Sequence, residues 1–294
     1  MCSKPSIAQV QYGKNKEDDK LPQLNLLLVF GEESGLPFYY RKLTGNIPDS
    51  KTVKHLFEDL DILGFGKTKF VMDRGFYSEE NINGLYRKHV KFLVGTKLSL
   101  KFIKNNLDDV YDDIRMFNNY DDGIATYGYT VSAEWDYTQE RPYKGNVIKD
   151  KRRIYIHYYY SIERRYLGYF ALITNETMDA FTALHLYRMK DVVEKAFGNI
   201  KERLNMRRLL VSSEKGLDGK IFTEFVSLIL ISHLDHKMKG TGLYSNYTML
   251  QLLDKLDVLE CFEDANHSLR IGEMLNKQAE IYEALGVDVP TSSC

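Results

Sequence analysis

The sequence lacks any long apolar run and contains few cysteines. No stretch approaches the roughly 18 consecutive apolar residues of a membrane span, and Met1–Lys4 is not followed by the apolar core of an export signal. The three cysteines, Cys2, Cys261 and Cys294, are far apart and show no paired metal-ligand spacing. These absences exclude the membrane-spanning and exported classes, and we expect a cytoplasmic protein without a disulfide framework.

No charge of one sign dominates the chain either. Forty lysine and arginine residues stand against 41 aspartate and glutamate residues, which gives a net charge of -1. A nucleic-acid partner cannot be inferred from this balance and would require a local basic surface. The length of 294 residues and the 44% hydrophobic content suffice for one large core or two modest ones.

The first 122 residues have the pattern of a mixed α/β fold. Apolar runs flank turn residues, and helical spacing alternates with short strands. The expected elements are a polar lead-in at 1–20, a β-hairpin over 24–43, a helix over 53–63, strands at 70–72 and 90–95, and a charged helix over 98–117. The strand at 70–72 runs directly into Asp73, so this carboxylate is expected at the carboxyl end of a strand.

From residue 123 the hydrophobic period changes to two, which predicts a block of strands, and from Asp179 onward the pattern is helical. The segment from Tyr127 to Tyr169 holds many of the 21 tyrosines, as expected of strands. We expect five regions: the lead-in at 1–20, a first core part at 21–122, a β-rich insertion at 123–176, closing core helices at 177–240, and a helical tail at 241–294.

The segment from Tyr187 to Lys201 is expected to be one helix with charged residues on a single face. At about 100° per residue, Tyr187, Lys190, Glu194 and Lys201 fall within roughly 60° of one another. An ordinary solvated helix with a Lys190–Glu194 pair four residues apart would have the same spacing. Spacing alone therefore leaves both interpretations open.

Taken together with Asp73, this segment resembles the signature helix of DDE-type insertion-sequence transposases. That signature is Tyr, Arg, Glu and Lys at these intervals, and Lys190 stands here in place of the arginine. The turn Asp73–Tyr77 is similar to the turn after the family's second catalytic aspartate, and the strands from 124 to 174 match its insertion. The resemblance covers roughly residues 10 to 240. It implies a ribonuclease-H-like core with a β-rich insertion before the glutamate helix and a helical C-terminal region.

The resemblance also implies a chemistry and a partner. Asp73 and Glu194 would hold the two divalent ions, Mg²⁺ or Mn²⁺, that in-line displacement at phosphorus uses. Tyr187, Lys190 and Lys201 would contact phosphates of double-stranded DNA at the element ends. Assembly as a homodimer and mixed assembly with a full-length transposase are both open.

One part of the family pattern is missing. The first catalytic aspartate belongs on a strand upstream of the hairpin, and no aspartate occurs before Asp18. Asp18 and Asp19 lie in a charged turn and would need another backbone path to reach the metal ions. We therefore expect a core without its first strand, an incomplete two-metal site and no activity. A non-catalytic DNA-binding or interfering remnant is the alternative.

Other residues have a functional and an ordinary interpretation side by side. The basic run Lys151, Arg152 and Arg153, and Arg207 and Arg208 further on, could bind DNA phosphates or simply be solvated. Trp135 in the insertion could stack on an extruded base or belong to the core. His157 is expected to be a packed, hydrogen-bonded histidine rather than a ligand.

Overall fold

The computed structural model describes residues 7–12, 21–64, 68–140, 147–161, 168–199, 209–263, 267 and 269–290. It divides into two compact units. The first comprises residues 1–25 and 42–192, and the second comprises residues 26–41 and 193–294. Among the described helices, none combines the length and the apolar character that a bilayer-spanning segment needs.

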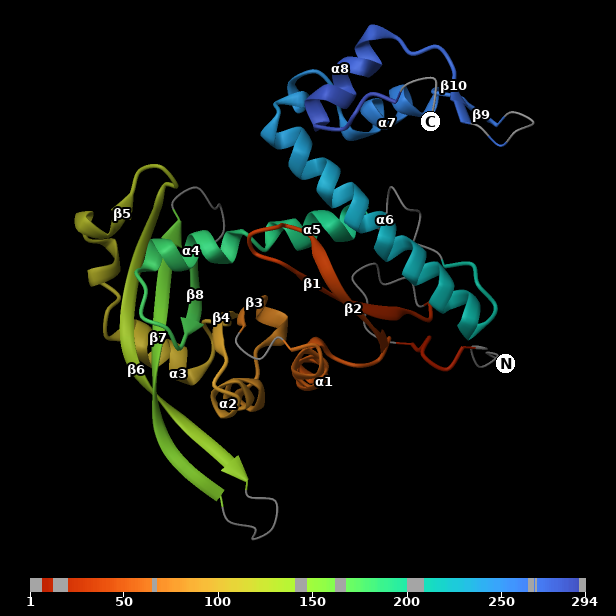
Figure 1. The fold of residues 1–294 in the computed structure, drawn as a ribbon. Coiled ribbons are helices and arrows are strands. Elements are labelled where there is room, and N and C mark those ends of the chain that lie inside the picture. The colour runs from red at the N-terminus through yellow and green to blue at the C-terminus, as the bar shows by residue number, and fades with distance from the viewer. Residues whose placement is uncertain are drawn as a thin grey trace. The chain divides into compact units, whose positions relative to one another are not determined.

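The first unit is built on a curled sheet of six described strands (Figure 1). Their order across the sheet is β3 (Lys69–Met72), β4 (Lys91–Thr96), β8 (Tyr169–Thr174), β7 (Val147–Ser161), β6 (Thr126–Glu140) and β5 (Tyr120–Asp121). β3 and β4 are parallel, and every other neighbouring pair is antiparallel. The mixed α/β class expected from the sequence is therefore confirmed, and the arrangement is consistent with a ribonuclease-H-like core.

Parallel strands require a crossover, and α2 (Glu79–Arg87) provides it between β3 and β4. The helix begins after Ser78, whose hydroxyl accepts a hydrogen bond from the Asn81 backbone N–H. Its buried side chains Ile82 and Leu85 face the core. The preceding helix α1 (Asp49–Ile62) buries Val53, Leu56, Phe57 and Leu60, which are the positions that helical spacing singles out.

Alternation along β7 sends side chains to the two faces of the sheet. On one face, the Tyr158 hydroxyl donates to the carbonyl of Ile103 in α3 (Lys101–Asp108) at 2.6 Å. On the other face, the Tyr159 hydroxyl donates to the carbonyl of Ala180 in α4 (Ala180–Arg188) at 2.5 Å. Helices therefore cover both faces of the sheet. The hydrogen bond from Tyr159 holds α4 against the same sheet whose strand β3 ends next to Asp73.

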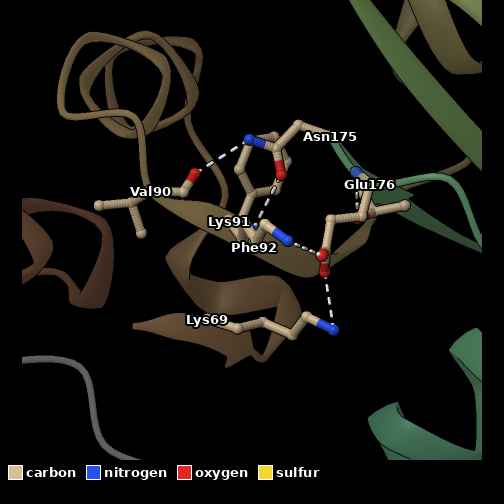
Figure 2. Close-up of polar contacts among 7 residues, drawn as sticks. Lys69, Val90, Lys91, Phe92, Asn175 and Glu176 are labelled. Carbon is tan, nitrogen blue, oxygen red and sulfur yellow. Dashed lines mark hydrogen bonds and ion pairs between the residues drawn. The ribbon is translucent and has the colours of Figure 1, made fainter. Parts of the chain in front are cut away.

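Two residues after β8 tie three strands together at one end of the sheet (Figure 2). The Asn175 amide continues the pairing with β4: its Nδ2 donates to the Val90 carbonyl, and its Oδ1 accepts from the Phe92 N–H. The carboxylate of Glu176 pairs with Lys91 at 2.5 Å and with Lys69 at 2.7 Å. Because Lys69 begins β3 and Lys91 begins β4, one carboxylate bridges the start of the parallel pair.

Four tyrosines lie in register across β5, β6, β7 and β8 on the face that carries α3. Tyr120 is opposite Tyr127, Tyr127 is opposite Tyr160, and Tyr160 is opposite Tyr169. The ring centroids of successive tyrosines are 4.7, 6.1 and 4.7 Å apart. The guanidinium of Arg115 lies 4.7 Å from the Tyr160 ring centroid and donates to the Tyr169 hydroxyl.

In the second unit, a hairpin packs against helices. β1 (Leu24–Phe30) and β2 (Pro37–Thr44) form a two-stranded sheet, as expected from the sequence, and residues 26–41 of it belong to this unit. Leu28 of the hairpin, Ala196 of α5 (Asp191–Gly198) and Leu228 of α6 (Glu214–Gly240) share one buried cluster. Apolar packing thus joins segments that are more than a hundred residues apart in sequence.

The end of the chain forms a second small core. The end of α6, a 3-10 turn at Leu243–Ser245, α7 (Met249–Asp257) and α8 (Asn276–Leu285) bury Met238, Leu252 and Ile281 together. The region is helical, as expected, apart from the short antiparallel pair β9 (Cys261–Glu263) and β10 (Leu269–Ile271). Cys261 is an exposed free thiol.

The expected helix over 98–117 is wrong in its length. α3 ends at Asp108, and two 3-10 turns follow, at Asp113–Arg115 and Phe117–Asn119. The physical cause is the distribution of charge. Four carboxylates at i,i+4 spacing would repel one another on one helix, and carboxylates near a helix C-terminus are unfavourable. These carboxylates belong to Asp108, Asp109, Asp112 and Asp113.

Candidate active site around Asp73

Asp73 lies where the sequence predicts it, at the carboxyl end of β3. The strand ends at Met72, and Asp73 then caps a 3-10 turn over Arg74–Phe76. Its carboxylate Oδ1 accepts a hydrogen bond from the Arg74 backbone N–H at 2.7 Å. The backbone thus turns away from the sheet at Asp73 and leaves the side chain at the strand end, 57% exposed.

A buried asparagine fixes this turn. The side-chain Nδ2 of Asn81 donates to the Phe76 carbonyl at 2.8 Å and to the Ser50 carbonyl at 2.7 Å. One amide therefore ties the turn after Asp73 to the start of α1 and to α2, on which Asn81 lies. Because buried carbonyl groups need partners, this amide stabilises one backbone path for the turn.

Tyr187 and Lys190, both predicted as site residues, lie beside Asp73. The Tyr187 hydroxyl donates to Asp73 Oδ1 at 2.8 Å, and the Lys190 ammonium lies 3.7 Å from the same oxygen. The ammonium is also 5.0 Å from the centroid of the Tyr187 ring. A hydroxyl, an ammonium and a backbone N–H therefore converge on one carboxylate.

These contacts change the acidity of Asp73. Partial burial would by itself raise its pKa, but the hydrogen bonds from Arg74 and Tyr187 and the positive charge of Lys190 outweigh it and lower the pKa. The carboxylate is therefore ionised at neutral pH. An ionised, half-exposed carboxylate can bind a cation or a hydrogen-bond donor.

The single helix predicted from Tyr187 onward is wrong. α4 ends at Arg188 and α5 begins at Asp191, with a turn between them. In this turn the Lys190 N–H bonds to the Tyr187 carbonyl, three residues back, instead of continuing the helical i→i−4 pattern. The turn directs Lys190 toward Asp73, which the 100° helical wheel could not predict.

Glu194 lies on α5, after the division between the two units, which falls between Val192 and Val193. Tyr187 and Lys190 belong to the first unit with Asp73, and Glu194 belongs to the second. The pairing of Glu194 with Asp73 stays a prediction. Five of the candidate site residues discussed from the sequence lie outside the described residues: Asp18, Asp19, Lys201, Arg207 and Arg208.

The basic run lies on the long β6–β7 hairpin and is accompanied by carboxylates. Lys151 pairs with Asp136 at 2.5 Å, and Arg152 pairs with Asp150 at 3.0 Å. The side chains of Lys151 and Arg152 are 59% and 46% exposed. Arg153, next in the run, is also exposed and faces Glu134 across the strands. These cations are accessible, but the neighbouring carboxylates reduce the net positive charge of this part of the hairpin.

Trp135 is a core residue in this structure. Its side chain is 5% exposed, its ring packs edge-on against Phe102, and its Nε1 donates to Asn83 Oδ1 at 2.8 Å. The ring is therefore not available to stack on a DNA base here, and the ordinary interpretation left open by the sequence is the one that the structure has.

The donor chemistry of Asp73 suits Mg²⁺ or Mn²⁺, because hard cations prefer carboxylate oxygens. Among the described residues, however, no three His, Cys, Asp or Glu side chains gather closely enough to hold a metal ion. The Asp73 carboxylate alone does not supply a complete set of ligands. No sequence pattern singles out Gly95, whose Cα lies close to the Tyr187 hydroxyl and to the Arg74 backbone nitrogen.

Comparison with known proteins gives one positive finding. A family model described as the transposase DDE domain matches residues 2–230. This match covers most of the chain, including β3, Asp73, the β6–β7 hairpin and the α4–α5 segment. No curated protein is similar enough to the chain to count as a match.

Proposed function

The chain belongs to the DDE transposase family, and from this membership we propose that it derives from an enzyme that cuts and rejoins DNA at insertion-element ends. In that reaction, divalent ions held by carboxylates activate the attacking oxygen and stabilise the leaving one. We propose Asp73 and Glu194 as the carboxylates that take part, with Mg²⁺ or Mn²⁺ as the ion.

One observation carries this proposal: Tyr187 and Lys190 meet Asp73 although they lie on separate elements far along the chain. The family signature places a tyrosine and a basic residue near the glutamate, and here they approach the aspartate at a strand end. A solvated helix with ordinary ion pairs gives no reason for such a contact. The convergence therefore supports a site in the first unit that contains Asp73, Tyr187 and Lys190.

We further propose that this chain does not cut DNA by itself. The Lys190 ammonium lies 3.7 Å from Asp73 Oδ1 and partly neutralises the charge that would attract a divalent ion. A metal ion at Asp73 would have to compete with this ammonium and with the Tyr187 hydroxyl.

The test of the metal ligands is Mn²⁺ binding measured by electron paramagnetic resonance. We expect Asp73→Asn and Glu194→Gln each to weaken Mn²⁺ binding by about tenfold or more. Asp122→Asn, which removes an exposed carboxylate in a turn of the first unit, is the matched control and should bind as the wild type does. Equal binding by wild type and Asp73→Asn would remove Asp73 from the proposed ligand set.

The test of inactivity is cleavage of a labelled duplex that carries an element end, with Mg²⁺ or Mn²⁺ present. We expect no cleavage by the wild-type chain. Cleavage that Asp73→Asn abolishes would overturn the proposed inactivity while supporting the role of Asp73. Cleavage that Asp73→Asn leaves intact would contradict both proposals.

The alternative function is non-catalytic DNA binding, alone or in mixed assemblies with a full-length transposase. The exposed cations Lys151, Arg152 and Arg153 on the β6–β7 hairpin favour it. A gel-shift with element-end DNA should show a band that weakens with salt, and replacing the three cations by glutamine should reduce the salt dependence. The lack of any salt-sensitive band would exclude this alternative.

A further inference from the structure

We propose that Gly95 is a positioning residue, because its missing side chain leaves the space through which the Tyr187 hydroxyl reaches the Asp73 carboxylate. Gly95 lies in β4, and the paired residues Met72 and Val94 directly precede Asp73 and Gly95 in the two parallel strands. The inference rests on the proposed function, since the orientation of Asp73 matters for DNA chemistry only if Asp73 takes part in it.

The space in question is narrow. A Cβ atom on Gly95 would lie 2.6 Å from the Tyr187 hydroxyl oxygen and 3.2 Å from Cζ of the same ring. It would also lie 3.2 Å from the Arg74 backbone nitrogen. Both of these groups donate hydrogen bonds to Asp73 Oδ1. Any side chain at position 95 would therefore collide with the atoms that hold the carboxylate.

The close approach of the Tyr187 hydroxyl and the Arg74 backbone explains why a glycine occupies position 95. Gly95 is buried in a strand with neighbours on both sides, β3 and β8, where glycine normally weakens a sheet. It is not among the glycines with positive φ, so the backbone conformation does not demand it. The other residues of β4 after Lys91 are Phe92, Leu93, Val94 and Thr96, all of them buried.

Tyr187 can move aside only by giving up its hydrogen bond to Asp73. Its ring packs against the buried cluster that contains Leu93 and Leu184, and its hydroxyl is bonded to Asp73 at 2.8 Å. The Arg74 nitrogen is backbone and is fixed by the turn that Asn81 holds. An added methyl group would therefore be accommodated mainly by displacing the Tyr187 hydroxyl from Asp73.

The test is Gly95→Ala, observed by ¹³C NMR of protein with ¹³Cζ-labelled tyrosine and without metal or DNA. The Tyr187 signal is assigned from its loss in Tyr187→Phe. We expect Gly95→Ala to move this signal toward the position of a water-exposed tyrosine. Gly84→Ala is the matched control in the same unit, because its Cβ would meet nothing closer than the Arg87 guanidinium at 3.9 Å. The control should leave the Tyr187 signal unchanged.

A double-mutant cycle provides the second measurement. Gly95→Ala should destabilise the wild-type chain, and the loss should be much smaller in a Tyr187→Ala background, where the space is vacant. We expect the two substitutions to be coupled by about tenfold or more in the unfolding equilibrium constant. An unchanged Tyr187 signal together with additive effects would overturn the proposal.

The cycle also decides the case in which Gly95→Ala does not fold. If the double variant Gly95→Ala/Tyr187→Ala folds, the clash with Tyr187 is the cause and the proposal holds. If neither variant folds, the Arg74 backbone is the critical contact and the proposal fails. Because these measurements use no metal and no DNA, their outcome is separate from that of the Mn²⁺ and cleavage experiments.

Discussion

The Tyr187 hydroxyl donates a 2.8 Å hydrogen bond to the carboxylate of Asp73, although 114 positions separate the two residues in the sequence. The contact joins the end of α4 to the end of β3 in the first unit. It is accompanied by the Lys190 ammonium at 3.7 Å. The end of β3 and the end of α4 thus meet in one polar centre around the Asp73 carboxylate. The strength of its contacts can be measured through the pKa of Asp73.

We expect Tyr187→Phe to raise the pKa of Asp73 toward its ordinary value, because one of the donors that lower it is lost. A lowered carboxyl pKa stabilises the fold above the pKa of the unfolded chain, and this contribution is lost as pH falls through the folded value. The variant should therefore lose less stability on acidification. Since Asp73 is half-exposed, we expect a change below about 1 kcal/mol.

Carboxyl ¹³C NMR of Asp73 and urea unfolding between about pH 2 and pH 6 measure the two effects. Tyr155→Phe is the control, because its hydroxyl bonds Thr177 rather than the Asp73 centre. An unchanged Asp73 titration in Tyr187→Phe would show that the hydrogen bond does not form in solution.

His157 makes a second acid-dependent contribution. It is fully buried, its Nδ1 shares a 2.8 Å hydrogen bond with the Thr130 hydroxyl, and burial lowers its pKa to about 4 despite the nearby charge of Asp179. The neutral ring stabilises the fold fully above about pH 6.5, and this stability is lost as pH falls toward 4. The unfolding free energy lost over this pH range is roughly 3 kcal/mol.

We therefore expect His157→Asn to flatten the dependence of the unfolding free energy on pH between about 4 and 6.5. Urea unfolding at several pH values gives this dependence. His236→Gln, which changes an exposed histidine, should keep the wild-type slope. A wild-type slope in His157→Asn would mean that another group causes the acid sensitivity.

Trp135 offers a direct test of its own placement, because it is the one tryptophan in the chain. We expect blue-shifted fluorescence that moves to the red on unfolding and does not change when DNA is added. Trp135→Ala should cost about 3–5 kcal/mol because a large cavity remains. Trp135→Phe should cost about 1 kcal/mol through the lost hydrogen bond to Asn83. Quenching by hairpin DNA would instead support the stacking role.

Glu176→Gln should destabilise the first unit by about 1 kcal/mol, because Lys69 and Lys91 both lose their charged partner. The loss should shrink as salt is raised, since screening weakens the pairs in the wild type. Unfolding in urea at low and high salt provides the comparison. Glu33→Gln, at an exposed turn position, is the control, and an equal loss in both variants would contradict the bridging role of Glu176.

Local patterns predicted the elements of the first unit well. The apolar run before Asp73 is a strand, and the change to a period of two after residue 123 marks β6, β7 and β8. In each case the pattern reflects which side chains a strand buries, and burial is a property that neighbouring residues encode. The family resemblance, which rests on Tyr187, Glu194 and Asp73, is confirmed by the match to residues 2–230.

The contacts at the site were less predictable, because they depend on backbone geometry. The turn at Met189–Lys190 has no glycine or proline to mark it, so the sequence favoured an unbroken helix. In the sequence, nothing distinguishes Gly95 from the other residues of an apolar strand. The reason for a glycine becomes visible only once the fold places the Tyr187 hydroxyl beside it. The sequence could not tell whether Trp135 lies in the core or at the surface, because its partners Asn83 and Phe102 are both distant in sequence.

The row formed by Tyr120, Tyr127, Tyr160 and Tyr169 has a consequence for how the long hairpin folds. Sliding β6 against β7 by one residue would turn the aromatic rings of one strand to the opposite side. Sliding by two would restore the side but leave Tyr127 diagonal to Tyr160 and weaken their contact. Within the row, the contact between Tyr127 and Tyr160 crosses from β6 to β7. This contact therefore favours the native alignment of the hairpin over alignments shifted by one residue.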